Sequence, residues 1–167
     1  MLASVRSAVL DGVDGRLVRV EVCVSRGLPG YTVVGLPDAA GRESRERVRA
    51  ALLSSGLAYP QTRVTVNLAP AAVRKSGAGL ELAIALGLLA AADALPAGAL
   101  DDVAVLGELG LDGRVRPVVG ALGIVHALVQ TGVSRVIVPA ANAHEAALVP
   151  LRARRAKPRR APRVPER

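Results

Sequence analysis

Residues 67–92 have the sequence NLAPAAVRKSGAGLELAIALGLLAAA, and this stretch decides the fold class. The segment 63–67 before it is β-branched and alternating, which predicts a strand. A loop with Pro70 follows, and then an apolar run, residues 80–92, in which Glu81 is the only charged residue. A run of about thirteen residues rich in Leu and Ala favours a buried helix over a strand, and it is shorter than the roughly 20 residues of a membrane span. We therefore expect a central helix that is covered on most sides.

Composition limits the class of protein. The 167 residues suffice for one domain with a real core. Half are hydrophobic, but Phe and Trp are absent, so the core must be built from Val, Leu, Ile and Ala. The single cysteine, Cys23, excludes an intramolecular disulfide, and a packed thiol is a better interpretation than a nucleophile. The N-terminus has no signal-peptide pattern, which predicts a cytoplasmic protein without a membrane partner.

The first third of the chain predicts strands and one amphipathic helix. Asp14-Gly15 is a hairpin turn signal between strands at 4–10 and 17–25, and the second strand carries valines on one face. A short strand is expected at 31–34. Asp38 is a candidate N-cap for a helix over 39–55, which ends before Gly56.

The helix over 39–55 has one apolar stripe and one charged side. The stripe consists of Ala40, Val48, Ala51, Leu52 and Ser55. The charged side holds Arg42, Glu43, Arg45, Glu46, Arg47 and Arg49. Glu43 and Arg47 have i,i+4 spacing and should pair. A solvated face is the simpler interpretation, and a contact with another subunit or with nucleic acid is the alternative.

The second half alternates short strands and helices. Strands are expected at 103–106 and 135–139, and a hairpin over 109–115 should turn at Asp112-Gly113. A helix over 120–131 should bury one side, formed by Leu122, Val125, Leu128 and Val129. Asn142 is expected to cap a last helical turn that runs through Leu148. The fold class is therefore α+β, with a mixed sheet and helices against one face.

The C-terminal segment 151–167, LRARRAKPRRAPRVPER, differs from the rest of the chain. It carries eight of the 22 basic residues and one of the 14 acidic ones, so residues 1–150 are nearly neutral. We expect one domain over 1–150 and a disordered basic tail. The tail offers a nonspecific nucleic-acid contact through Arg152, Arg154, Arg155, Lys157, Arg159 and Arg160. A tail without function and a shifted reading frame are the alternatives.

The motifs for common chemistries are absent. Lys75-Ser76 lacks the preceding glycines of a phosphate-binding loop, and Gly77-Ala-Gly79 lacks the third glycine of a dinucleotide fingerprint. His144-Glu145 has no second histidine at zinc-protease spacing, and His126 has no cysteine cluster beside it. The patterns thus assign no catalytic, cofactor or metal residue.

Several segments together resemble the N-terminal domain of the ComM/YifB family of magnesium-chelatase-like AAA+ ATPases. The resemblance covers about residues 1–150. Its segments are VVGLPD (33–38), ESR (43–45), RVR (47–49), NLAP (67–70), KSG (75–77), LGEL (106–109), GRVRP (113–117) and VPAAN (138–142). It implies a fold like ribosomal protein S5 domain 2 and the Lon proteolytic domain, followed by an AAA+ module with the Walker motifs. It also implies a homo-oligomer linked to competence and DNA branch migration.

The Lon resemblance implies where a Ser–Lys dyad would lie. The Lon serine follows a Lys-Asp-Gly-Pro run, which corresponds to 75–78 here and places Gly79 at the nucleophile. The Lon lysine follows a Pro-x-Gly-Gly-Leu run, which corresponds to 117–121 and places Leu122 at the base. Neither side chain can perform the chemistry. A peptidase with a relocated Ser76–Lys75 pair is a minor alternative.

We therefore expect a non-catalytic accessory domain of a ComM/YifB-type ATPase in a truncated or frameshifted product. ATP and magnesium are implied only for the AAA+ module that this chain lacks. Arg74 and Lys75 are candidates for an anion or partner contact near a helix N-terminus, and a solvated loop is the alternative. A free-standing nucleic-acid-binding protein that uses the tail and the helix with Arg42, Arg45 and Arg49 is the alternative function.

Overall fold

The computed structural model describes residues 1–35, 39–73, 75 and 79–150, without the side chains of 40–42. The predicted N-cap at Asp38 and the predicted tail at 151–167 lie outside these residues. The strands are β1 (Leu2–Asp11), β2 (Asp14–Ser25), β3 (Gly30–Val34), β4 (Arg63–Ala69), β5 (Val103–Val105), β6 (Glu108–Leu109), β7 (Val115–Arg116) and β8 (Arg135–Ile137). The helices are α1 (Ala39–Ser54), α2 (Glu81–Ala91), α3 (Ala121–Gln130), a 3-10 turn η1 (Ala140–Asn142) and α4 (Ala143–Ala146).

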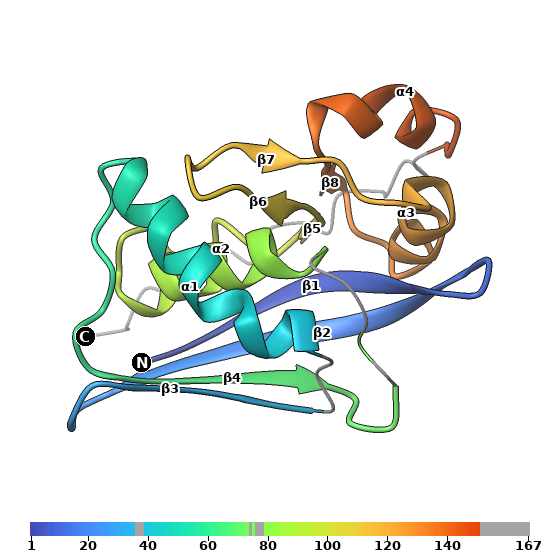
Figure 1. Ribbon diagram of the computed structural model, residues 1–167. Coiled ribbons are helices and arrows are strands. Elements are labelled where there is room, and N and C mark those ends of the chain that lie inside the picture. Colours follow the sequence, from blue (N-terminus) through green and yellow to red (C-terminus); the bar gives the residue numbers. More distant parts are fainter. Residues whose placement is uncertain (36–38, 74, 76–78, 151–167) are drawn as a thin grey trace, which may run out of the picture.

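Six strands form one mixed sheet in the order β3-β4-β2-β1-β5-β8 (Figure 1). β1 and β2 are antiparallel to each other, as are β2 and β4. The pairs β3–β4, β1–β5 and β5–β8 are parallel. β6 and β7 form a separate antiparallel ribbon, which was predicted from Asp112-Gly113. The predicted α+β class with a mixed sheet is confirmed.

The β1–β2 hairpin turns two residues earlier than predicted. Asp14 pairs with Asp11 and Gly15 pairs with Leu10, so both residues of the predicted turn lie in β2. The turn is formed by Gly12 and Val13, where Gly12 has a φ of 64°. Gly15 is required for another reason: a Cβ at this position would lie 2.5 Å from the carbonyl oxygen of Gly123 in α3. The glycine therefore permits close packing of a helix, and the turn prediction was wrong.

Helices pack on both faces of the sheet, which corrects the prediction of one covered face. Val103 and Val105 of β5 belong to the core beneath α1 and α2, whereas Ala104 between them belongs to a second core that includes Leu128 of α3. Successive side chains of a strand point to opposite faces, so α3 covers the face opposite α2. The sequence of β5 shows no alternation because all three of its residues are buried.

The predicted central helix is confirmed as α2, and eight of its eleven residues are buried. Gly87 lies against the sheet, where an added Cβ would be 2.6 Å from Cγ2 of Val22. The missing side chain therefore lets the helix approach β1 and β2 closely. Glu81, the one charge of the apolar run, is 1% exposed.

α3 was predicted correctly in extent but not in its buried side. Val125, Leu128 and Val129 are buried as expected, whereas Leu122 is 42% exposed. Ile124 takes the buried position instead. The apolar pattern alone did not distinguish the two because residues on both sides of this helix are apolar.

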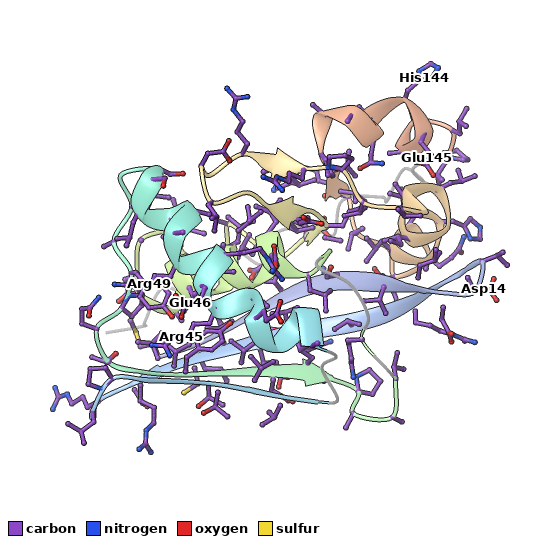
Figure 2. The ribbon with its side chains drawn as sticks, viewed as in Figure 1. Asp14, Arg45, Glu46, Arg49, His144 and Glu145 are labelled. Carbon is purple, nitrogen blue, oxygen red and sulfur yellow. The ribbon has the colours of Figure 1, made fainter. Side chains whose placement is uncertain are left out.

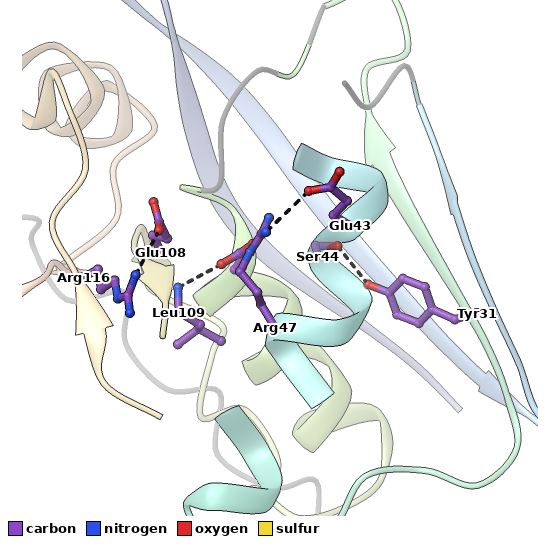
Figure 3. Close-up of polar contacts among 8 residues, drawn as sticks. Tyr31, Glu43, Ser44, Arg47, Glu108, Leu109 and Arg116 are labelled. Atoms are coloured by element: carbon purple, nitrogen blue, oxygen red, sulfur yellow. Dashed lines mark hydrogen bonds and ion pairs between the residues drawn. The ribbon is translucent and has the colours of Figure 1, made fainter. Parts of the chain in front are cut away.

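α1 follows the predicted apolar stripe, with Val48, Ala51 and Leu52 buried. At its start, the hydroxyls of Ser44 and Tyr31 lie 3.3 Å apart, which ties α1 to β3 (Figure 3). Burial is the main cause that raises the pKa of Tyr31 from 10.0 to about 12. The fold therefore disfavours the phenolate.

This shift predicts loss of stability in alkali. The protonated phenol is favoured by the folded state, so its stabilisation is complete below pH 10 and is lost as the pH rises from 10 to about 12. Phenolate absorbance should report Tyr31 titrating near pH 12 in the folded chain, and Tyr31→Phe should remove that step. Titration of Tyr31 at its ordinary pKa in folded protein would contradict the packing described here.

None of the described helices has the length and apolar character needed to cross a membrane.

Candidate functional site

A buried carboxylate joins three elements beside the start of α2. Glu81 Oε2 accepts a hydrogen bond of 2.9 Å from the N–H of Leu109 in β6. Its Oε1 accepts one from Nε of Arg47, which extends inward from α1. Arg47 also pairs at 3.7 Å with Glu43, so the predicted i,i+4 pair is confirmed (Figure 3). Arg47 was expected on a solvated face, but its side chain is only 26% exposed because it pairs with Glu81.

In this cluster, burial and hydrogen bonding shift the pKa of each charged group in opposite directions. Burial is the main cause that raises the pKa of Glu81, and the hydrogen bonds from Leu109 and Arg47 act in the opposite direction. The pKa of Arg47 is raised, chiefly by its hydrogen bond to Glu81. A buried charge with one cation and one backbone donor is suited to fixing the position of α2 and β6. Contact with the reacting atoms of a substrate is not required for that role.

Gly79, the expected nucleophile position, lies at the entrance of α2. Its carbonyl accepts a 2.9 Å hydrogen bond from Gly107, whose own carbonyl accepts from Leu82. A Cβ at Gly79 would contact Val118 at 3.4 Å. A cavity of about 430 Å³ opens here, lined by Ala8, Val9, Leu10, Gly12, Gly79, Glu108, Pro117, Val118, Val119 and Ile124. Among the described residues of this lining, Glu108 is the one with an ionisable side chain.

One wall of this cavity is held by Asn142. The N–H of Val118 donates to Asn142 Oδ1 at 2.9 Å, and Asn142 Nδ2 donates to the Val118 carbonyl at 3.0 Å. The side-chain amide of Asn142 therefore pairs with the backbone of Val118 as a neighbouring strand would. It makes no capping hydrogen bond to α4. The predicted capping role was wrong. Asn142 instead fixes the loop that carries residues 117–120.

Replacing Asn142 by alanine should destabilise the fold by about 1–3 kcal/mol, because two partly buried backbone groups of Val118 lose their partner. Amide exchange of residues 118–120 should rise more than that of β1. Asn142→Asp keeps the acceptor and loses the donor, so the free energy of unfolding of this variant should lie between those of the wild type and of Asn142→Ala. Equal stability of all three proteins in urea would reject this role.

Leu122, the expected base position, does not line the cavity beside Gly79. It borders another cavity, of about 400 Å³, with Val13, Asp14, Gly15, Gly123, His126, Leu148, Val149 and Pro150. The N–H of Leu122 donates to Glu145 Oε1 at 2.9 Å, so α4 supplies a carboxylate to the first turn of α3. Figure 2 shows Glu145 and His144 on α4. The two expected dyad positions thus border different cavities.

Lys75 is buried, with 2% of its surface exposed, so the alternative of a solvated loop is wrong for this residue. Its ammonium donates to the carbonyl of Pro70. Burial lowers its pKa. Ser76 and Arg74 lie outside the described residues, so the relocated pair and the anion contact stay predictions.

The three described arginine side chains of α1, Arg45, Arg47 and Arg49, do not form one basic surface. Arg45 and Arg49 are exposed (Figure 2), but Arg45 lies 3.7 Å from Glu46, and Arg47 extends toward Glu81. The side chain of Arg42 lies outside the described part, as do Arg152, Arg154, Arg155, Lys157, Arg159 and Arg160. The nucleic-acid contact therefore stays a prediction.

Within the described residues, no group of three or more His, Cys, Asp or Glu side chains is placed to hold a metal. The cysteine and both histidines lie in separate elements, in β2, α3 and α4.

Comparison with known proteins identifies the family. The family model for subunit ChlI of Mg-chelatase matches residues 20–142. The chain belongs to this family. Among curated proteins similar to this chain, an uncharacterized protein of Mycobacterium tuberculosis is 46% identical over 143 residues, which are 86% of this chain and 28% of the relative.

The ChlI-family relatives include YifB and ComM. YifB of Escherichia coli is 41% identical over 148 residues, and competence protein ComM of Haemophilus influenzae is 43% identical over 148 residues. Each alignment covers 89% of this chain and 29% of the relative. The chain therefore spans less than a third of the length of these relatives, and the predicted ComM/YifB resemblance is confirmed.

A more distant similarity extends to proteases. Lon protease 2 of Bacillus subtilis is 26% identical over 151 residues, which are 81% of this chain and 27% of that protease. This similarity agrees with the predicted Lon-like fold.

Two parts of the site were missed from sequence. The only sequence signal for the Glu81–Arg47–Leu109 cluster is an isolated charge in an apolar helix. This pattern indicates that the charge has a buried partner, but it does not identify the partner. The pairing of Asn142 with Val118 had no local signal, because the two residues are far apart in the chain.

Proposed function

We propose that this domain is a non-catalytic accessory part of a magnesium-chelatase-like AAA+ ATPase. The ChlI family match supports the ATPase context. One observation carries the non-catalytic part: the positions that correspond to the Lon dyad hold Gly79 and Leu122 and border different cavities. A hydroxyl and an amine within hydrogen-bond reach are the minimum for that chemistry.

Packing supports a scaffold role. The residues around the former dyad positions are fixed by structural hydrogen bonds, from Gly107 to Gly79, from Val118 to Asn142 and from Leu122 to Glu145. Glu81 anchors the same region to α1 and β6. A rigid, Lon-shaped surface can serve a neighbouring ATPase without turnover of its own. By this proposal, ATP and magnesium bind the ATPase module.

A peptidase assay on the full chain tests the absence of turnover. We expect peptide hydrolysis at the rate of buffer alone and no labelling by a serine-directed reagent. Lys75→Ala and Ser76→Ala serve as controls for the relocated pair. Labelling of wild type that both substitutions abolish would overturn the non-catalytic assignment.

The accessory role is tested in a longer relative. ATP hydrolysis is measured for the M. tuberculosis relative, for a form without its matching segment, and for a chimera that carries residues 1–150 of this chain. Deletion should reduce hydrolysis or ring assembly, and the chimera should restore it. Full activity of the deletion form would reject the accessory role.

DNA contact is part of the proposal only for the whole ATPase. Binding by the full chain should fall steeply with salt if the basic tail alone supplies it. Replacing the six tail residues Arg152, Arg154, Arg155, Lys157, Arg159 and Arg160 by glutamine should then abolish binding, whereas Arg45→Gln with Arg49→Gln should leave it unchanged. The reverse result would assign DNA contact to α1.

A further inference from the structure

Exposed apolar side chains gather where the described chain ends. Val13 is 86% exposed, Leu148 is 68% exposed and Leu122 is 42% exposed, and all three line the 400 Å³ cavity between the β1–β2 turn and α3. We call these three residues the α3–α4 face. Figure 2 places Asp14 at the end of the hairpin, on the same side of the molecule as Glu145. Asp14 and His126 are the ionisable groups among the described residues that line this cavity.

A second apolar groove lies next to the first. It has a volume of about 410 Å³ and is lined by Val125, Val136, Val138, Ala143, Ala146, Ala147, Val149 and Pro150. Val149 and Pro150 line both grooves. Pro150, the last residue before the segment 151–167, therefore lies between two apolar surfaces. Clustered apolar groups of this kind are typical of surfaces that another protein segment covers.

We propose that the α3–α4 face docks the ATPase module joined after residue 150 in a full-length family protein. This inference rests on the proposed function. Two observations select this occupant: the chain spans only 28–29% of its relatives, and Pro150, after which a following module would be joined, lines the same cavity as the α3–α4 face. The segment 151–167 of this chain is chemically unsuited to it, because its eight basic residues cannot fill apolar grooves.

Hydrogen exchange tests the docking directly. Amide exchange of residues 119–126 and 143–149 is compared between the full chain and the chimera of residues 1–150 with the rest of the M. tuberculosis relative. Docking should slow exchange in these segments of the chimera by about tenfold or more. Slowing should be absent from 26–30, at the turn between β2 and β3.

Substitutions identify the residues responsible. The triple variant Val13→Gln, Leu122→Gln and Leu148→Gln should return exchange in the chimera to the rate of the full chain. Leu28→Gln, at a residue 83% exposed between β2 and β3, is the matched control and should keep the slow exchange. Thermal unfolding of the same variants in the full chain verifies that they fold.

Three results would overturn the inference. The first is equal amide exchange in the chimera and the full chain, and the second is slow exchange that persists in the triple variant of the chimera. The third is a dimer of the full chain in sedimentation that is lost in the triple variant. The last would make a second copy the occupant. Exchange reports docking independently of ATP hydrolysis, so slow exchange with unaltered hydrolysis in the deletion form would reject the accessory role and keep the docking face.

Discussion

Replacing Glu81 by alanine should lower the free energy of unfolding by about 3–5 kcal/mol, the range expected when one partner of a buried ion pair is removed. The carboxylate is 1% exposed and accepts hydrogen bonds from Arg47 and from the N–H of Leu109. Its loss leaves the Leu109 donor unsatisfied and removes one of the carboxylates that pair with the partly buried guanidinium of Arg47. Urea denaturation measures the change.

Two controls separate this effect from a general loss of charge. Glu108→Ala removes a neighbouring carboxylate whose side chain is 35% exposed and whose ion pair with Arg116 spans 4.0 Å (Figure 3), so it should cost less than about 1 kcal/mol. Arg47→Ala combined with Glu81→Ala should cost less than the sum of the single changes. Additive losses would show that the two side chains do not act as a pair.

Most elements were predictable because local patterns and packing agree. β2 alternates, α1 has one apolar stripe, and α2 is apolar on nearly all sides, and each formed as predicted. The predictions failed where one residue type serves two purposes. The glycine of Asp14-Gly15 signals a turn locally, but the structure uses it for contact with α3.

The other features that the sequence did not predict are contacts between residues far apart in the chain. Asn142 contacts Val118 across 24 positions, and Arg47 contacts Glu81 across 34. Their spacing has no helical or strand period, so the sequence of one partner does not point to the other. The exposed Leu122 was likewise assigned to the core, because only the packing of α3 reveals that Ile124 is buried instead.

Gly87→Val should destabilise the protein by about 3 kcal/mol or more, because the added side chain overpacks a buried contact. Valine has a higher helix propensity than glycine, but this gain of less than about 1 kcal/mol is too small to offset the overpacking. A Cβ at this position would lie 2.6 Å from Cγ2 of Val22 and 3.5 Å from Cγ2 of Val5. Either α2 must move away from β1 and β2, or these valines must leave their rotamers. Thermal and urea unfolding of the variant measure the cost.

A second substitution in β2 tests whether Val22 is the residue that a side chain at position 87 would clash with. Val22→Ala alone leaves a cavity and should destabilise the core, but it also frees the space that a side chain at position 87 needs. Gly87→Val should therefore cost at least about 1 kcal/mol less in the Val22→Ala background than in wild type. Ala90→Val, on a half-buried position of the same helix, controls for placing a β-branched residue in α2 and should cost about 0.5 kcal/mol. If Gly87→Val and Ala90→Val were equally mild, close contact between α2 and β2 could not be what requires glycine.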